Sequence, residues 1–147
     1  MKLEKYWEKR KFEKTPEPRG EVKETGLNRF VVQKHQATRL HYDFRLEMDG
    51  VLKSWAVPKG IPTKRGIKYL AVEVEVHPVD YLDFQGIIPP GEYGAGTVEI
   101  WDSGEYELIE RKPDRLEFIL KGKRLSGKFV LILMRKKGKG NWLLFKA

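Results

Sequence analysis

The sequence predicts an all-β, mainly antiparallel protein that closes into a barrel of about eight strands. From Asn28 onward, apolar and β-branched residues recur with a period of two, as in strands that bury one face. These runs lie at 29–33, 40–46, 51–57, 67–76, 96–101, 105–109, 115–120, 128–134 and 141–145. Turn-forming pairs such as Asp49-Gly50 and Ser103-Gly104 separate runs, and no helical pattern intervenes. A closed barrel is therefore favoured, with a two-sheet sandwich as the alternative.

The first 24 residues follow a different pattern. Leu3, Tyr6 and Trp7 recur at roughly helical spacing, and the segment Thr15-Pro16-Glu17-Pro18-Arg19-Gly20 then interrupts regular structure. We expect a short amphipathic helix and an extended arm over 1–24, followed by the barrel over 25–147. A chain of 147 residues fits a single domain with a sizeable core.

Composition narrows the classes of function. The net charge is +8, and residues 111–140 hold eleven basic residues against two acidic ones, so a polyanion is the first partner to consider. No apolar run approaches the ~20 residues that span a bilayer, and Met1 opens a charged segment, so we expect no membrane association and a cytoplasmic location. Because the sequence contains no cysteine, a metal would have to be held by imidazole and carboxylate groups.

The strand over 40–47 carries the strongest chemical signal. Its even-numbered residues are apolar and are predicted to face the core, while the other face presents His41, Asp43 and Arg45 about 6.5–7 Å apart. At that spacing His41 and Asp43 can share one metal ion while Arg45 reaches an adjacent anion. A turn over 36–39 would bring His35 to the same pocket. The pattern indicates a metal-assisted phosphate site, with a solvated outer face of mutually screened charges as the alternative.

Other candidate residues are expected around that strand. With Leu70 and the valines at 72, 74 and 76 taken as the core face, His77 points away from the core. Lys59 follows a strand exit from which its ammonium group can reach a phosphate, and Tyr81 can donate its hydroxyl to a phosphate oxygen. The alternative is that Lys59 is an ordinary surface lysine and that Tyr81 only packs against its neighbours. The Gly- and Pro-rich segment from Asp83 to Gly96 is a predicted functional loop that lacks the features of a nucleotide P-loop.

Five blocks of sequence, in order, carry a family pattern. They are Arg29-Phe30-Val31-Val32-Gln33-Lys34-His35, Arg39-Leu40-His41-Tyr42-Asp43-Phe44-Arg45-Leu46-Glu47, Trp55-Ala56-Val57-Pro58-Lys59-Gly60, His77-Pro78-Val79-Asp80-Tyr81 and Gly91-Glu92-Tyr93-Gly94-Ala95-Gly96. Together they resemble the 3′-phosphoesterase domain of bacterial DNA ligase D, in its stand-alone form, from about Tyr6 to the C-terminus. The resemblance implies a β-barrel with its active site in a surface groove.

The resemblance also implies an activity. Members of the family are divalent-metal enzymes, usually manganese-dependent, that heal DNA 3′ ends during non-homologous end joining. They remove a 3′-terminal ribonucleotide from a primer-template as phosphodiesterases, then remove the remaining 3′-phosphate as phosphomonoesterases. The implied partners are DNA primer-template 3′ ends bearing a ribonucleotide or a phosphate, together with a DNA ligase and other end-joining proteins.

Residue roles follow from the same resemblance, position by position. The implied metal ligands are His35, His41 and Asp43. The implied phosphate contacts are Arg45, Lys59 and His77. The implied catalytic residues are His77, Arg45 and Tyr81. The implied supporting residues are Gln33, Arg10 and Glu17.

Two positions depart from the family pattern, and two other functions stay open. Lys11 stands where the family often has an aspartate that is thought to assist the diesterase step, and Tyr69 stands where an arginine commonly contacts phosphate. The balance between the two activities is therefore open, and the diesterase step is the more affected. The alternatives are a non-catalytic nucleic-acid-binding β-barrel with an aromatic and basic platform, and a domain that only docks on a ligase or polymerase.

Overall fold

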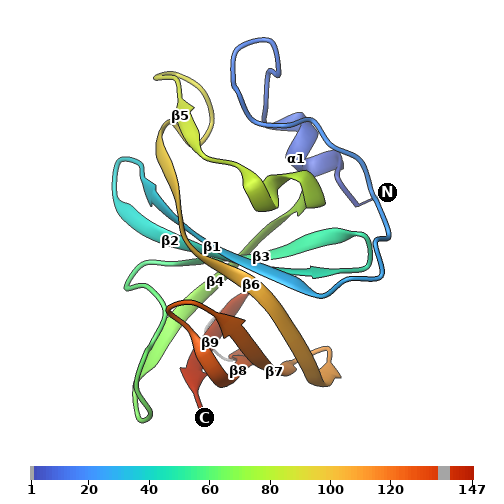
Figure 1. Ribbon diagram of the computed structural model, residues 1–147. Coiled ribbons are helices and arrows are strands. Elements are labelled where there is room, and N and C mark those ends of the chain that lie inside the picture. The colour runs from blue at the N-terminus through green and yellow to red at the C-terminus, as the bar shows by residue number, and fades with distance from the viewer. Residues whose placement is uncertain (1, 136–139) are drawn as a thin grey trace.

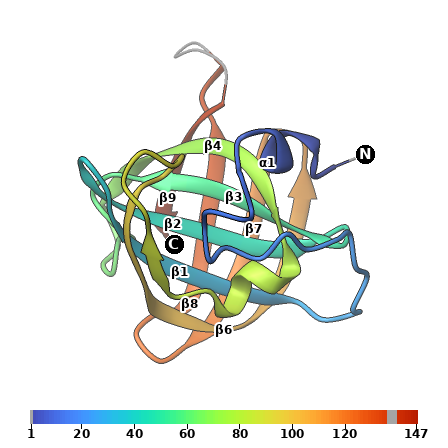
Figure 2. The ribbon, with the colours of Figure 1, turned by 90° about the horizontal axis from the view of Figure 1, so that it is seen from above.

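In the part of the chain that the structure describes, nine antiparallel strands form one sheet, and eight of them close into a barrel (Figures 1 and 2). The computed structural model describes residues 2–135 and 140–147. The barrel order is β1-β2-β3-β4-β9-β8-β7-β6, and β6 pairs back onto β1. The barrel strands are β1 (Arg29–Gln36), β2 (Leu40–Met48), β3 (Val51–Val57), β4 (Lys68–Pro78), β6 (Gly96–Lys112), β7 (Arg115–Gly122), β8 (Ser126–Leu133) and β9 (Asn141–Lys146). The predicted all-β barrel is confirmed.

Three short elements lie outside the barrel on one side of β1–β4 (Figure 1). They are α1 (Glu4–Glu8), the 3₁₀ helix η1 (Val79–Asp83) and β5 (Gly86–Ile88), which pairs with the outer end of β6. The helix expected near the N-terminus is confirmed, and the side chains of its Tyr6 and of Leu3, which precedes it, are fully buried. Neither helix in the described ranges has the length and apolar character needed to cross a bilayer.

Strands β1–β4 form one wall of the barrel, and an apolar cluster packs against each face of this wall. The barrel interior is filled from strands all round the wall, including Phe30, Phe44, Trp55, Phe118 and Leu144. A second cluster covers the outer face and joins the arm, η1 and β5 to Val31 and Leu52 of the wall. Strands β1–β3 are therefore buried on both faces, so polar residues on the outer face are also removed from water.

One predicted turn is confirmed and another is wrong. Asp49 and Gly50 connect β2 to β3 with φ angles of 57° and 77°, as a tight type I′ hairpin turn requires. Ser103-Gly104 is not a turn, because β6 continues through it from Gly96 to Lys112. A Cβ at Gly104 would lie 2.2 Å from the carbonyl oxygen of Lys121, so this glycine permits close strand approach.

The predicted core face of β4 is also wrong. Ala71 lies in the barrel interior and Leu70 is 42% exposed, the opposite of the expected alternation. Ser54 pairs with Val74 but Leu52 pairs with His77, so β4 carries one extra residue over this stretch. This β-bulge reverses the alternation and turns His77 to the outer face. His77 thus lies on the outer face as expected, but it does so because of the bulge, which the sequence pattern did not predict.

Candidate active site

A pocket of about 340 Å³ lies on the outer face of β1, β2 and β4, beneath the N-terminal arm and the β5–β6 loop. Eight residues singled out in the sequence line it: Arg10, Glu17, His35, His41, Asp43, Arg45, His77 and Tyr81. The remaining supporting candidate, Gln33, is fully buried and hydrogen-bonds Arg45. The β1–β2 hairpin, the arm and η1 therefore bring together residues that are far apart in the chain.

His35, His41 and Asp43 form a group that could hold a metal ion. The hairpin register pairs His35 with His41 and Gln33 with Asp43, so the three side chains project from one face. His35 Nδ1 lies 3.4 Å from Asp43 Oδ2, and His41 Nε2 lies 3.3 Å from Asp43 Oδ1. One ligand atom from each residue falls within 4.8 Å of the others. Two imidazoles and a carboxylate suit a divalent transition metal.

Backbone carbonyls orient both imidazole rings. His35 Nε2 donates to the Gly94 carbonyl at 2.7 Å, and His41 Nδ1 donates to the Arg39 carbonyl at 3.3 Å. These bonds leave His35 Nδ1 and His41 Nε2 facing Asp43, the orientation in which metal-binding histidines are commonly held. In the metal-free protein the hydrogen bond with Asp43 raises the pKa of His41, so a cation would displace a proton there.

The Asp43 carboxylate is ionised although it is only 6% exposed. Burial alone would raise its pKa, but the Arg45 guanidinium and the hydrogen bonds from His35 and His41 hold the pKa well below its usual value. A carboxylate that stays charged inside a covered pocket is a suitable ligand for a cation.

Arg45 is a buried cation with a free donor. Its Nε donates to Gln33 Oε1 at 2.8 Å, and its guanidinium lies 4.8 Å from the centre of the Tyr81 ring. Gln33 Nε2 in turn donates to the carbonyls of Tyr81 and Phe84, which ties the guanidinium to η1. Arg45 Nη1 is buried and has no hydrogen-bond partner among the described residues. An unsatisfied guanidinium beside the metal group fits a negatively charged oxygen of a ligand.

His77 is buried and neutral at the other side of the pocket. Its Nδ1 donates to the Glu75 carbonyl at 2.9 Å, so Nε2 accepts from Arg10 Nη2 at 3.3 Å. Burial and the charges of Arg45 and Arg10 lower the pKa of His77 well below its usual value. His77 Nε2 is therefore an acceptor before any ligand binds.

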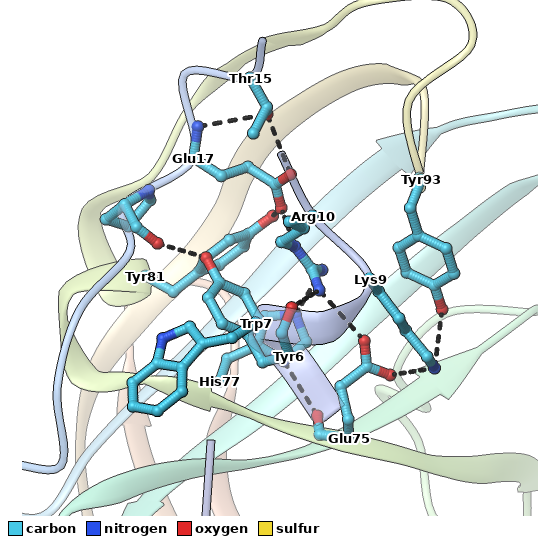
Figure 3. A network of polar contacts seen from close by, with 12 residues as sticks. Tyr6, Trp7, Lys9, Arg10, Thr15, Glu17, Glu75, His77, Tyr81 and Tyr93 are labelled. Atoms are coloured by element: carbon cyan, nitrogen blue, oxygen red, sulfur yellow. Dashed lines mark hydrogen bonds and ion pairs between the residues drawn. The ribbon is translucent and has the colours of Figure 1, made fainter. Parts of the chain in front are cut away.

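The N-terminal arm closes the pocket through a network of polar contacts (Figure 3). Glu17 is the centre of this network: it accepts from Tyr81 Oη at 2.7 Å, from Arg10 Nε at 2.9 Å and from Thr15 Oγ1 at 3.0 Å. Arg10 also reaches Glu75, at 3.3 Å. Burial, together with Glu17, raises the pKa of Tyr81 well above its usual value, so its phenol stays protonated.

Some candidate residues lie elsewhere, and three site residues were missed. Lys59 is exposed in the turn after β3 and is not among the described residues that line the pocket. Of the two departures from the family pattern, Lys11 is exposed, and Tyr69 packs against the barrel interior. The missed residues are Glu75, Tyr93 and Lys9. Only Tyr93 had a signal in the sequence, its place in the predicted functional loop.

The chain is similar to known proteins over most of its length. A family model described as the DNA ligase D 3′-phosphoesterase domain matches residues 33–133. The chain is 51% identical over 154 residues to the multifunctional non-homologous end joining protein LigD of Pseudomonas aeruginosa, covering 99% of this chain and 18% of that protein. It is 51% identical over 137 residues to the multifunctional non-homologous end joining DNA repair protein LigD of Mycobacterium tuberculosis, covering 89% of this chain and 18% of that protein. The chain thus spans about a fifth of the length of the curated relatives it matches.

Proposed function

The chain belongs to the family of DNA ligase D 3′-phosphoesterase domains, and from this premise we propose that it is a divalent-metal-dependent hydrolase that heals DNA 3′ ends for end joining. Residues 1–24 would serve as an arm over the barrel of 25–147. The observation that carries the proposal is the His35, His41 and Asp43 group with the unpaired Nη1 of Arg45 in the same pocket. A cation site beside a fixed guanidinium matches the charge of a phosphate ester.

Two hydrolyses are proposed at one site. In the diesterase step, water adds to the phosphorus between the primer and its 3′-terminal ribonucleoside. The bond to the ribonucleoside O5′ breaks, giving a primer 3′-phosphate and a nucleoside whose O5′ gains a proton. In the monoesterase step, water adds to that phosphate, the bond to the primer O3′ breaks, and inorganic phosphate and a 3′-hydroxyl result.

The residues of the pocket fit a divalent cation such as Mn²⁺ in donor type and orientation. When bound, the ion would act as a Lewis acid on a phosphoryl oxygen and help to orient the attacking water. His35 and His41 would each supply the ring nitrogen that faces Asp43, and Asp43 would supply the negative charge.

The other pocket residues would act on the phosphate directly. Arg45 would offer its free Nη1 to an equatorial oxygen, an interaction commonly worth about 3–4 kcal/mol in the transition state. His77 starts neutral with Nε2 as an acceptor, which favours receiving a proton during the reaction over donating one already held. Tyr81 would line the site and fix Arg45 through its ring. The exposed Lys59 would approach the phosphate from outside the pocket.

The basic C-terminal third is the proposed contact for the DNA backbone. Within 111–140 the structure describes 111–135 and 140, so part of that stretch, 136–139, lies outside the described residues. Exposed cations include Lys121 near the end of β7, and Lys123 and Arg124 on the β7–β8 turn. The buried Asp102 organises this turn by accepting from three of its backbone N–H groups. DNA affinity should therefore fall steeply as salt concentration rises.

The test is an end-processing assay. A labelled primer-template with a 3′-ribonucleotide or a 3′-phosphate is incubated with Mn²⁺, and we expect shortening of the first and dephosphorylation of the second. His41→Ala should abolish both reactions with little change in DNA affinity. Binding without turnover in the native protein would favour the non-catalytic barrel. No DNA binding and no metal uptake would favour the docking domain.

A further inference from the structure

Tyr93 is an aromatic residue at the rim of the pocket that the proposed chemistry does not use. It is 47% exposed, yet it lines the pocket. Lys9 Nζ and the guanidinium carbon of Arg10 lie over its ring, 4.9 Å and 5.2 Å from the centre. Figure 3 shows Tyr93 beside Lys9, at the edge of the network of polar contacts. Nearly half of Tyr93 stays exposed beside these cations, so part of its ring is open to a ligand.

The loop around Tyr93 holds the ring at a fixed place relative to the metal group. The Glu92 N–H donates to the Pro89 carbonyl at 3.2 Å, and the Ala95 N–H donates to the Glu92 carbonyl at 3.1 Å. The next residue, Gly94, accepts the 2.7 Å hydrogen bond from His35. The loop that orients one candidate metal ligand therefore also presents Tyr93 to the pocket.

The pocket is larger than a phosphate requires. Its volume of about 340 Å³ lies at the lower end of pockets that enclose small organic ligands. The metal group and Arg45 Nη1 provide for the phosphate inside the pocket, whereas Tyr93 lies at the rim. A substrate whose phosphate carries a further nucleoside would extend from the first region to the second.

We propose that Tyr93 forms a subsite for the terminal nucleoside, with the exposed part of its ring stacked on the base. This inference rests on the proposed function and extends it, because it names the group that distinguishes the two substrates. An aromatic ring stacks on any base, so the subsite would accept nucleosides of any sequence. Only the diesterase substrate carries a nucleoside beyond the reacting phosphate, so only that substrate would use Tyr93.

Equilibrium binding in EDTA tests the subsite without turnover. Fluorescence anisotropy would measure the dissociation constants of two labelled primer-templates, one ending in a 3′-ribonucleotide and the other in a 3′-phosphate. Tyr93→Ala should weaken binding of the ribonucleotide end by about tenfold, a typical loss for one stacked base. Binding of the phosphate end should change by less than about twofold, because that end offers no base at the rim.

Steady-state kinetics with Mn²⁺ and three further variants test whether the aromatic ring itself is responsible. The KM for ribonucleoside removal should rise in Tyr93→Ala while phosphate removal stays unchanged. Tyr93→Phe should behave as the native protein, and Tyr93→Leu, which keeps bulk without a ring, should behave as Tyr93→Ala. Ile87→Ala is the control, because Ile87 is 67% exposed on β5 and is not among the described residues that line the pocket.

Either of two outcomes overturns the subsite: no loss in Tyr93→Ala, or equal losses on both ends. Failure of the proposed function is a separate result, namely a native protein that processes neither end with Mn²⁺. The binding comparison in EDTA remains decisive for Tyr93 in that case.

Discussion

The two faces of β2 are both buried, but by different means. Phe44 and Leu46 point into the barrel and pack against apolar side chains from strands all round the wall. Asp43 and Arg45, their neighbours in sequence, point outward and are only 6% and 3% exposed. The outer face is covered by segments distant in sequence, the arm that carries Glu17 and the loop that carries Gly94.

This difference separates what stabilises the fold from what prepares the chemistry. Burying apolar groups is favourable in itself, whereas burying charge is unfavourable unless partners compensate. Asp43 has such partners, but Arg45 keeps a buried donor with none among the described residues. The interior face therefore accounts for stability, and the outer face holds desolvated charge ready for a ligand.

The largest expected effect comes from the outer face. Asp43→Asn keeps the size of the side chain but removes the only carboxylate of the metal group, so Mn²⁺ binding and turnover should fall by about 10³-fold or more, beyond the 10- to 100-fold typical of losing a supporting partner. Titration calorimetry and the end-processing assay measure both. Asp49→Asn, in the exposed turn at the end of the same strand, is the matched control. Retained Mn²⁺ affinity in Asp43→Asn would contradict the account.

The second-largest expected effect is on stability and comes from Phe44, the neighbour of Asp43 that faces the barrel interior. Phe44→Ala should lower the free energy of unfolding by about 3–5 kcal/mol, because it leaves a cavity among fully buried rings. Urea denaturation measures the loss. Mn²⁺ affinity of the folded fraction should stay close to that of the native protein. A large loss of metal affinity with no loss of stability would show that the two faces are not separate.

Gln33→Leu tests a residue of β1 that connects Arg45 on β2 to the segment around η1. The substitution leaves Arg45 Nε and the carbonyls of Tyr81 and Phe84 without their partner, which should destabilise the fold by about 1–3 kcal/mol. Because Arg45 loses its orientation, turnover should also fall, by about tenfold. Thermal melts and steady-state rates check the two effects, and a change in only one of them would contradict the linking role.

The smallest effect concerns acid stability. His77 is neutral when folded because burial, Arg45 and Arg10 lower its pKa, whereas the unfolded chain binds a proton below about pH 6.5. The contribution of His77 is therefore present above that pH and is lost as pH falls, by at most about 1.4 kcal/mol per pH unit. His41, whose pKa is raised, titrates in the opposite sense.

The comparison of native protein with His77→Gln isolates this contribution. Urea denaturation between pH 7 and pH 5 should show a steeper loss of stability in the native protein than in the variant. Equal slopes would contradict the neutral, buried imidazole.

Features set by local alternation were predictable from the sequence, and features set by distant contacts were not. His35, His41 and Asp43 were placed together because a hairpin pairs residues close in sequence. The β4 face was wrong because a bulge shifts the alternation, and the prediction for His77 held only through that bulge.

The residues that cover the site come from segments distant in sequence, and the sequence pattern did not predict these contacts. Lys9 joins the site because the arm folds back across β4, which no periodicity encodes. Glu75 lines the pocket from β4 itself, next to the bulge. Ser103-Gly104 looked like a turn because glycine serves both turns and close strand packing. The family resemblance supplied Arg10 and Glu17, which alternation did not indicate.

The central claim is that two imidazoles and one carboxylate hold a single divalent ion in this pocket. Electron spin echo spectroscopy of Mn²⁺ bound to the native protein tests it directly, because nitrogen ligands modulate the echo. The account predicts one ion per chain with two imidazole nitrogens, reduced to one nitrogen in His41→Ala. A bound ion without nitrogen modulation, or with an unchanged spectrum in His41→Ala, would contradict it.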